Sequence, residues 1–439
     1  MFRRVRGEAE TSTRMSPPPS AARSASSVFT DVPHLRLRPL SCRLCGAPAD
    51  AAPVAVCEHC LGPLEPSYDP QRTLPTRQEI ESRPRSLWRY AEWLPLASAP
   101  LVSLDSGYTP LLDAPALAKA LGVRRALVKN DAVSHPTCSF KDRVVAVALN
   151  AAVGLGLDTV GCASTGNLAN AVAAQAARAG LNAWIFIPED LELGKVIGTA
   201  VYGPRLVRVR GTYDDVNRLC VQVAERFGWG IVNVNLRGYY GEGSKTMAFE
   251  IAEQLGWRLP DAVIAPMAGG SLVTKLDKGF QEFLSAGLVA GAAPRMYGAQ
   301  ALGCAPIVNL VASGGEVLEP VIPNTIARSI AIGNPADGRF AARAIRRSGG
   351  DAASVTDPEL LEGIRLLART TGVFTETAGG VTVAAALKLA REGRLRPSDE
   401  LVLCITGNGL KTVEAVQPAL PETPVINPRL REVAALVSA

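Results

Sequence analysis

The sequence lacks any long, uninterrupted hydrophobic run. No segment of its 439 residues approaches the roughly 18 uncharged apolar residues that a membrane-spanning helix needs. Aromatic residues are also scarce, at 5% of the chain, and no basic run is interleaved with them, as a surface that stacks nucleic-acid bases would require. Because 47% of the residues are hydrophobic and 20% are charged, the composition predicts a soluble globular protein with neither a membrane nor a nucleic acid as partner.

The N-terminal segment, residues 1–38, lacks the apolar centre of a secretory signal. Its first 25 residues carry five arginines against two glutamates, and its composition cannot bury enough apolar surface to fold, so we expect a disordered tail. The arginine content also resembles a transit peptide, whereas the two early acids and a second possible start at Met15 favour an extended N-terminus equally well. We therefore expect a cytoplasmic protein and leave organellar transit open.

A chain with no export signal is expected to keep its thiols reduced, so its nine cysteines are interpreted first as metal ligands. Four of them follow the pattern C-x2-C-x11-C-x2-C, namely Cys42, Cys45, Cys57 and Cys60. Four thiolates can surround zinc and leave no position for water, so this site is expected to be structural and to fasten a small zinc-ribbon-like module over residues 39–70. A ribbon that has lost its metal, or four chance cysteines, is the alternative. The five scattered cysteines mostly lie in apolar surroundings, which favours buried filler.

The remaining length exceeds what one compact core usually supports, so two domains are expected. Short apolar, β-branched runs alternate with helix-period segments, which predicts parallel strands covered on both faces and a doubly wound α/β architecture. The expected strands are residues 125–131, 159–165, 183–188, 205–211, 231–235, 261–267, 295–300 and 400–406. The expected limits are 71–110 and 241–425 for a large cofactor-binding domain, 111–240 for a small domain and 426–439 for a C-terminal tail.

Polar turns follow three of these strands, where ligands bind in such sheets. Residues 164–167 read STGN before an alanine-rich helix, and residues 268–271 read AGGS at another helix start, where free backbone N–H groups suit a phosphate. Thr406 ends a strand before the Gly-rich turn GNGLKT. For any single loop, glycines that merely permit a tight turn are an equally good interpretation.

One lysine, Lys141, lies in the segment HPTCSFKDRVV (135–145), where a long apolar helical pattern begins. Beside such a cleft, burial and neighbouring cations would lower its pKa and let the amine form a Schiff base. Taken alone, a solvated surface lysine is the more common case.

In this order, the lysine, the asparagine turn, the glycine loop and the strand-end hydroxyl resemble the fold-type II pyridoxal-phosphate enzymes. More specifically, residues 40–420 resemble the threonine synthases of the tryptophan synthase β-like family. The segments that carry this resemblance are the two CxxC knuckles with LGPLEPSYD, SLWRY, GYTPLL, PTCSFKDR, STGNLANAVAA, EGSKTMAFEIAEQLGW, GGSLVTK and TGNGLKT.

The resemblance implies a role for each matching residue. Lys141 would be the Schiff-base lysine and proton shuttle, and Phe140 would pack beside it. Asn167 would bond the ring oxygen of pyridoxal 5'-phosphate, and Thr406 would face the pyridine nitrogen through a hydroxyl. The cofactor phosphate would be held by Ala268, Gly269, Gly270 and Ser271. The residues that would bind the substrate are Ser164, Thr165, Ser271 and Arg237. A homodimer is also expected from the family.

The implied reaction converts O-phospho-L-homoserine and water into L-threonine and phosphate, which would make the protein a lyase of threonine biosynthesis. A related enzyme that acts on another phosphorylated amino acid, such as a cysteate synthase using sulfite, stays open as the main alternative. A serine or threonine dehydratase is less favoured, because little chain remains after residue 420 for a regulatory domain. A non-catalytic relative is a remote alternative, since Lys141 is present.

Four positions depart from the family pattern. Leu168 replaces a common threonine after the asparagine, and Cys138 replaces a glycine before SFKDR. Gly270-Ser271 replaces a second Gly-Asn pair, and the arginine expected before EGSKT is found only at a shifted spacing, as Arg237. These positions concern the substrate phosphate more than the cofactor.

Overall fold

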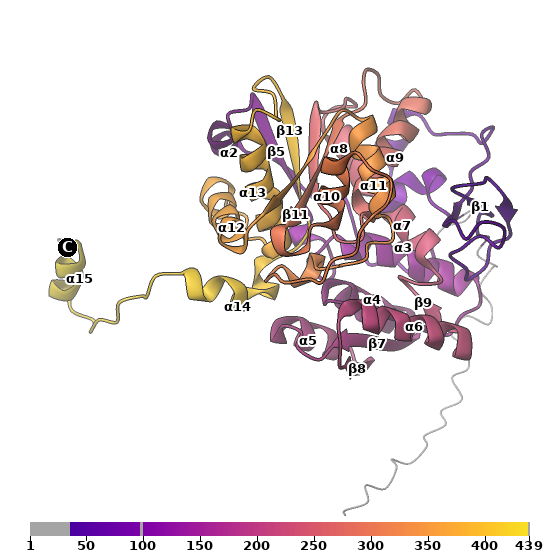
Figure 1. Cartoon of the computed structure of the whole chain (residues 1–439), viewed down its shortest axis with the longest axis horizontal. Coiled ribbons are helices and arrows are strands. Elements are labelled where there is room, and N and C mark those ends of the chain that lie inside the picture. The colour runs from indigo at the N-terminus through magenta and orange to yellow at the C-terminus, as the bar shows by residue number, and fades with distance from the viewer. Residues whose placement is uncertain (1–35, 97–99, 438–439) are drawn as a thin grey trace, which may run out of the picture. The chain divides into compact units, whose positions relative to one another are not determined.

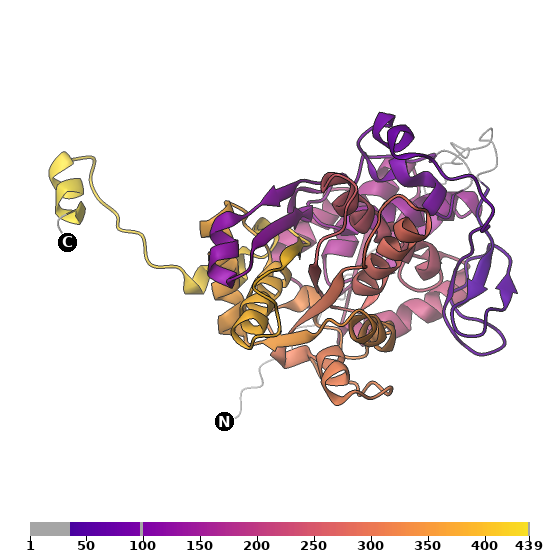
Figure 2. The same ribbon diagram turned by 90° about the horizontal axis from the view of Figure 1, so that it is seen from above.

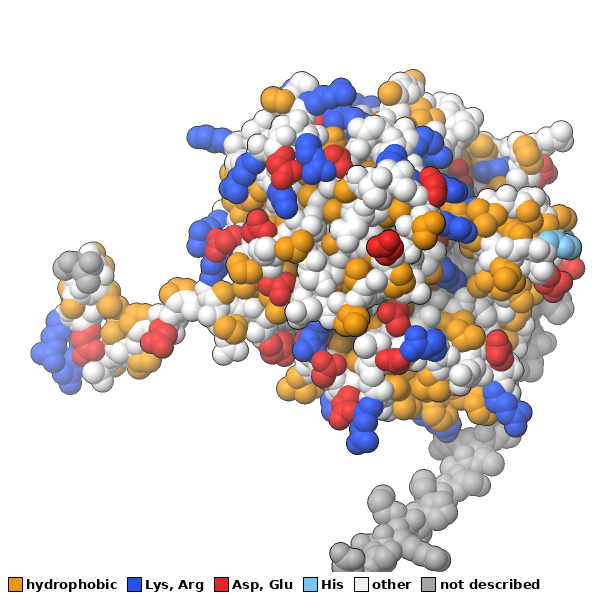
Figure 3. Space-filling model, viewed as in Figure 1, with side chains coloured by type: hydrophobic (Ala, Val, Ile, Leu, Met, Phe, Trp, Pro, Cys, Tyr) orange, Lys and Arg blue, Asp and Glu red, His pale blue; other side chains and the backbone are white. Residues whose placement is uncertain are grey.

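The computed structural model describes residues 36–96 and 100–437. The tail expected over residues 1–38 lies outside the described residues except for its last three positions. Leu37 forms an antiparallel bridge with Leu96, and the Arg38 N–H donates to the Pro95 carbonyl at 2.9 Å. No helix within the described ranges is long and apolar enough to span a membrane. On the face seen in Figure 3, basic and acidic side chains are interspersed.

The largest sheet has six strands in the order β12-β11-β10-β13-β5-β4. All neighbouring pairs are parallel except β4 with β5, which is antiparallel. The strands are β4 (Leu111–Asp113), β5 (Arg125–Asn130), β10 (Ala262–Pro266), β11 (Arg295–Ala301), β12 (Ala352–Val355) and β13 (Glu400–Ile405). The doubly wound α/β prediction is therefore confirmed, with one antiparallel strand at the edge.

Alternate residues of each central strand enter two different cores. In β10, Ile264 belongs to the hydrophobic cluster on one face, and its neighbours Val263 and Ala265 belong to the cluster on the other. Because strand side chains alternate between faces, burial on both faces requires an uninterrupted apolar run. This explains why the sequence of β10 shows no alternation of polar and apolar residues.

Helices cover both faces of this sheet (Figure 1). One face carries α2 (Pro115–Leu121), α12 (Asp357–Thr371) and α13 (Thr377–Arg391). The other carries α8 (Lys245–Gln254), α9 (Ser271–Ser285), α10 (Pro306–Ser313) and α11 (Gly338–Arg347). Each apolar face of the sheet is thus removed from water.

A second, parallel sheet has four strands in the order β8-β7-β6-β9. These are β6 (Thr159–Ala163), β7 (Asn182–Pro188), β8 (Arg205–Val209) and β9 (Gly230–Ile231). The helices α3 (Lys141–Gly154) and α4 (Asn167–Ala179) share one cluster with it, and α6 (Tyr213–Phe227) shares another. The remaining helices in this part are α5 (Leu193–Ala200) and α7 (Arg237–Gly243).

A three-stranded antiparallel ribbon precedes both sheets, in the order β2-β1-β3, and is drawn in indigo in Figure 2. Its strands are β1 (Leu40–Cys42), β2 (Pro48–Ala49) and β3 (Leu64–Pro66). The buried ribbon residues Leu40, Cys42 and Leu64 belong to the same cluster as α3 and α4. The ribbon therefore extends the core of the four-stranded sheet.

Several expectations need correction. The limit placed at residue 111 is wrong for the sheets, because β4 and β5 pair with the six-stranded sheet. The strand expected over 231–235 is only Gly230–Ile231, since the Asn233 side chain takes the place of a strand partner and accepts from the Ala163 N–H at 3.1 Å. The C-terminal tail contains a short exposed helix, α15 (Leu430–Val437).

Between the ribbon and β4, the chain forms α1 (Arg77–Ser82) and then the 3-10 helix η1 (Leu87–Trp93). Trp93 and Tyr90 of η1 are fully buried. Their rings lie against Phe249 and Phe283, with centroids between 5.3 and 6.0 Å apart.

Candidate active site

One cavity of about 190 Å³ lies where the ends of strands from both large sheets meet. β6 ends at Ala163, β10 at Pro266 and β13 at Ile405, and the polar turns that follow these strands line the cavity. Every residue predicted to bind cofactor or substrate is in its wall: Phe140, Lys141, Ser164, Thr165, Asn167, Arg237, Ala268, Gly269, Gly270, Ser271 and Thr406. Strand ends are where open α/β sheets bind ligands.

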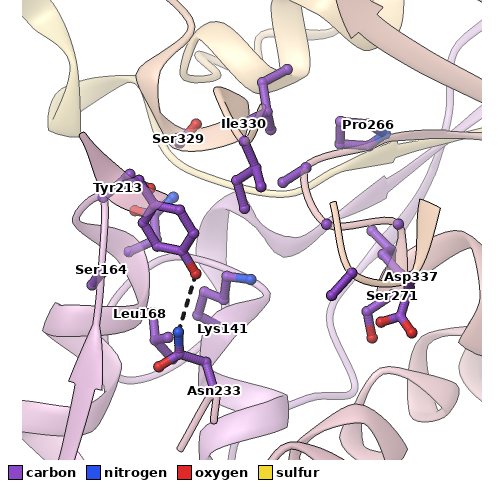
Figure 4. Close-up of a pocket in the computed structure, with 18 of the residues that line it drawn as sticks. Lys141, Ser164, Leu168, Tyr213, Asn233, Pro266, Ser271, Ser329, Ile330 and Asp337 are labelled. Carbon is purple, nitrogen blue, oxygen red and sulfur yellow. Dashed lines mark hydrogen bonds between the residues drawn. The ribbon is translucent and has the colours of Figure 1, made fainter. Parts of the chain in front are cut away.

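Lys141 is the first residue of α3, and its side chain projects toward the cavity (Figure 4). The amine donates to the Tyr240 hydroxyl at 2.7 Å and lies 4.4 Å from the centroid of the Phe140 ring. Desolvation disfavours the charged amine and outweighs the attraction of the Glu376 carboxylate, so the pKa of Lys141 falls to about 8. The neutral amine, the form that a nucleophile or base requires, is therefore far more populated near physiological pH than in an ordinary lysine.

The turn after β6 is held by its own serine. Ser164 Oγ accepts from the N–H groups of Gly166 at 2.9 Å and Ala169 at 2.8 Å. Gly166 has φ of 120°, and an added Cβ would lie 2.1 Å from Lys195 Cδ, so this position requires glycine. Because the Ser164 oxygen accepts twice, its own proton stays available to a ligand.

Asn167 begins α4 and lies in the same wall. Its Nδ2 donates to Glu376 Oε1 at 2.7 Å, and its Oδ1 accepts from Lys411 Nζ at 3.1 Å. Glu376 Oε2 is buried and has no hydrogen-bond partner among the described residues. The asparagine is thus fixed in orientation by two charged groups.

The glycine loop after β10 has the properties of a phosphate cradle. No side chain caps the start of α9, so its first N–H groups are free to bind an anion. Gly270 has φ of 89°, and a Cβ added at Gly269 would meet nothing within 4 Å, so the Gly269 backbone faces open space. The Asp337 N–H donates to the Gly269 carbonyl at 2.9 Å and fixes the loop from behind. These features suit the phosphate of pyridoxal phosphate.

Arg237, predicted as a substrate contact, forms an ion pair with Asp337 at 2.6 Å, and both residues line the cavity. Figure 4 shows Asp337 beside Ser271. The pair leaves Arg237 positioned at the wall, with 30% of its side chain exposed.

The polar residues of the cavity that were not predicted include Tyr213, Asn233, Tyr240, Asp337 and Glu376. Asn233 Nδ2 donates to the Tyr213 hydroxyl at 3.1 Å, the dashed line of Figure 4. A signal did exist for Tyr240, because it follows Arg237 by three residues in one helix and so faces the same side. Glu376 and Asp337 precede helices far away in the chain, and no local pattern marks them.

The four cysteines of the ribbon come together away from this cavity. Their sulfur atoms all lie within 4.8 Å of one another, with Cys42 to Cys60 at 3.4 Å and Cys45 to Cys57 at 3.8 Å. Tetrahedral zinc with bonds of about 2.3 Å places sulfurs about 3.8 Å apart. A Cβ added at Gly62 would lie 2.8 Å from Cys42 Sγ, so close packing at this site also requires a glycine. The donor set suits a zinc ion.

Comparison with known proteins agrees with this geometry. Residues 102–407 match the family described as "Pyridoxal-phosphate dependent enzyme". A threonine synthase of Methanocaldococcus jannaschii is 37% identical over 87% of this chain and 95% of its own length. One from Synechocystis is 40% identical over 73% of this chain and 82% of its own length. The chain belongs to the threonine synthase family of pyridoxal-phosphate dependent enzymes.

Solved structures of other proteins share the fold of this threonine synthase family member. A fungal L-serine ammonia-lyase from Rhizomucor miehei superposes with a TM-score of 0.61 at 22% identity and covers 71% of this chain and 97% of its own. A pyridoxal 5'-phosphate-dependent aspartate racemase also gives a TM-score of 0.61, at 17% identity, and covers 77% and 96%. At such low identity, these likenesses establish the fold alone.

Proposed function

We propose that this enzyme converts O-phospho-L-homoserine and water into L-threonine and phosphate, as a lyase. The observation that carries the proposal is the Lys141 amine, which lies in a cavity wall between a free helix start and Asn167, with its pKa lowered to about 8. When bound, pyridoxal phosphate supplies an electron sink that makes protons next to the amino group of its substrate acidic.

Different residues would hold different parts of the cofactor. The N–H groups around Gly269, Gly270 and Ser271 bind its phosphate at the start of α9, with Ala268 leading into the loop. Asn167 bonds the ring oxygen, and Thr406 faces the ring nitrogen through a neutral hydroxyl, which does not enforce protonation there. Phe140, beside the lysine, packs against the ring.

Lys141 transfers the protons of the reaction. Its neutral amine removes the α proton of the substrate and later a β proton, and the resulting ammonium returns protons to carbon. One mobile amine can serve several carbons because it sits at the end of a long, flexible side chain.

The substrate would be held by its two anionic ends. The Ser164 hydroxyl, whose oxygen already accepts two N–H bonds, donates to the carboxylate together with Thr165. Arg237, held in place by Asp337, faces the substrate phosphate together with Ser271. The departures at Leu168 and Cys138 leave this part of the proposal the more open to another phosphorylated amino acid.

The experiment supplies purified protein with pyridoxal phosphate and O-phospho-L-homoserine, and measures released phosphate and the amino-acid product. Threonine is the expected product. A visible cofactor band that responds to the amino acid without formation of threonine would favour the alternative of a β-replacement enzyme. O-phosphoserine with sulfite would then be the next substrate pair to test.

A structural zinc ion in the ribbon is a second proposal. The four sulfurs of Cys42, Cys45, Cys57 and Cys60 have the separations that tetrahedral zinc needs. Metal analysis of the protein purified without chelator should give one zinc per chain.

A cytoplasmic location and a homodimer are proposals that rest on the family alone. Measurement of the mass in solution tests the dimer.

A further inference from the structure

Tyr240 forms a direct hydrogen bond with the Lys141 amine, and the proposed reaction assigns it no role. Its hydroxyl accepts from Lys141 Nζ at 2.7 Å, and the ring centroid lies 5.5 Å from the same nitrogen. Tyr240 lines the cavity, yet only 8% of the residue is exposed. The hydroxyl therefore touches the atom that moves protons.

The hydroxyl also has a proton to give. A tyrosine hydroxyl that accepts through a lone pair keeps its single proton free to donate, and no acceptor for it is found among residues 36–96 and 100–437. Burial raises the pKa of Tyr240 well above its ordinary value, so the group stays protonated at neutral pH. The free proton is thus directed to whatever occupies the cavity.

The place of Tyr240 in α7 decides which part of the substrate it meets. Residues three apart on a helix are neighbours on one face, and Arg237 stands three positions before Tyr240. Both line the cavity, and the charges of Arg237 and Asp337 act on the Tyr240 hydroxyl. A phosphate that pairs with Arg237 therefore lies on the same side as this hydroxyl.

We propose that Tyr240 is a catalytic acid that protonates the departing phosphate and is then reprotonated by Lys141. This inference rests on the proposed function, because it takes the leaving group to be a phosphate. An ester phosphate that leaves without a proton would leave as the strongly basic trianion, so a proton donor at the bridging oxygen lowers the barrier.

The proton balance closes within the site. The Lys141 amine accepts a proton from a substrate carbon and becomes an ammonium. The bond between the γ carbon and the phosphate oxygen breaks, its electron pair stays on that oxygen, and the Tyr240 hydroxyl gives the oxygen its proton. The ammonium then passes a proton to the tyrosinate along the 2.7 Å hydrogen bond. One proton has moved from carbon to phosphate, and both side chains are restored.

The test compares Tyr240→Phe with Tyr239→Phe. Tyr239 is the adjacent tyrosine, but its hydroxyl bonds the backbone of Ala52 in the ribbon, accepting from the N–H at 3.1 Å and donating to the carbonyl at 3.2 Å. Titration with pyridoxal phosphate, followed by the visible band, should give the same affinity for both variants and the wild type. This spectroscopic readout shows that the site is intact before activity is compared.

Two reactions then separate an acid from a positioning role. The first is phosphate release from O-phospho-L-homoserine, for which Tyr240→Phe should lower kcat on the order of 100-fold or more and Tyr239→Phe should change little. The second is exchange of the α proton of L-threonine in D₂O, which uses Lys141 but no leaving group and should be nearly unchanged in Tyr240→Phe. If both reactions fall together, Tyr240 only positions Lys141, and if neither falls it has no role; each result overturns the proposal.

A second substrate controls for a non-specific loss of activity in Tyr240→Phe. L-2-Amino-4-chlorobutanoate carries chloride in place of phosphate, and chloride leaves without a proton. The ratio of variant to wild-type rate should be near one for chloride release and far below one for phosphate release, whereas equal ratios would contradict the inference. Failure of the proposed function is distinguished in the wild type itself, which would then release no phosphate from O-phospho-L-homoserine, and that result would overturn both proposals.

Discussion

Glu376 Oε1 accepts a hydrogen bond from Asn167 Nδ2 at 2.7 Å across a separation of 209 residues in the chain. Asn167 opens α4 beside the four-stranded sheet, and Glu376 precedes α13 on the six-stranded sheet. The contact therefore joins the two halves of the cavity wall. It also brings a carboxylate close enough to favour the charged form of the Lys141 amine.

This carboxylate should tune the pH at which Lys141 reacts. Glu376 raises the pKa of Lys141 against the larger effect of desolvation, with a net value of about 8. Glu376→Gln removes the negative charge, so the amine should lose its proton at a lower pH than in the wild type. NMR titration of labelled lysine in the cofactor-free protein measures this directly. A midpoint that is unchanged or higher would contradict the assignment, and Glu392→Gln, at an exposed site, serves as the control.

Replacement of Lys141 by alanine should abolish the visible band that forms with pyridoxal phosphate, because no other amine is expected to bond the cofactor. Lys411 and Lys195 lie nearby, but they are held by Asn167 and by Glu192. Absorption spectra of Lys141→Ala and of Lys119→Ala, a variant at an exposed helix position, make the comparison. A normal band in Lys141→Ala would assign the Schiff base to another lysine.

A buried ion cluster beneath α3 should matter more for stability than any surface pair. Glu250 pairs with Lys129 at 2.6 Å and with Arg143 at 2.8 Å, and all three side chains are fully buried. Removal of one charge leaves the others uncompensated, so Glu250→Gln should lower the free energy of unfolding by about 3 to 5 kcal/mol. Urea denaturation measures the loss. Glu316→Gln, which breaks exposed pairs with Arg343 and Arg346, should cost about 1 kcal/mol or less, and equal losses would refute the prediction.

The same cluster sets a dependence on acid. Burial disfavours the charged Glu250, but Arg143 and Lys129 outweigh burial and lower its pKa to about 2. In the unfolded chain a glutamate has a pKa of about 4.3. The stabilisation is therefore fully present above that pH and is lost as the pH falls toward 2. The wild type should therefore lose more stability between pH 5 and pH 3 than Glu250→Gln does.

Cys42→Ser should lose the metal of the ribbon and lower the thermal stability of the protein. Zinc bound by four thiolates contributes its binding energy to folding, and the ribbon core is continuous with the cluster around α3 and α4. Metal content and melting temperature are the measurements, with Cys220→Ala as a control at a buried cysteine outside the ribbon. Unchanged metal content and stability in Cys42→Ser would show that the cysteines hold no structural ion.

Local sequence patterns predicted the parts of the fold that have local causes. The apolar runs of the central strands were predictable because both faces of each strand are buried, as Val263 and Ile264 show. The strand β12 was missed because Ala352–Val355 is short and follows a glycine pair. The predicted sheet of β5 was also wrong, since strand order depends on pairing with β13, whose residue Glu400 lies 275 residues after its partner Arg125.

The candidate site divides in the same way. Lys141, Asn167, Gly269 and Thr406 lie directly at strand ends or helix starts, so motifs point to them. Glu376 and Asp337 reach the cavity by tertiary packing: Asp337, for example, is placed by its N–H bond to the Gly269 carbonyl. Neither composition nor spacing can predict such a contact from a single sequence.

The central claim is the reaction on O-phospho-L-homoserine. The most direct measurement is the amount of phosphate released by the protein with pyridoxal phosphate, together with chromatographic and mass identification of the amino-acid product. We predict equal amounts of phosphate and L-threonine, formed at a rate of about 1 per second or faster. A cofactor band that responds to the substrate without any threonine would contradict the proposed reaction and assign this cavity to a different phosphorylated amino acid.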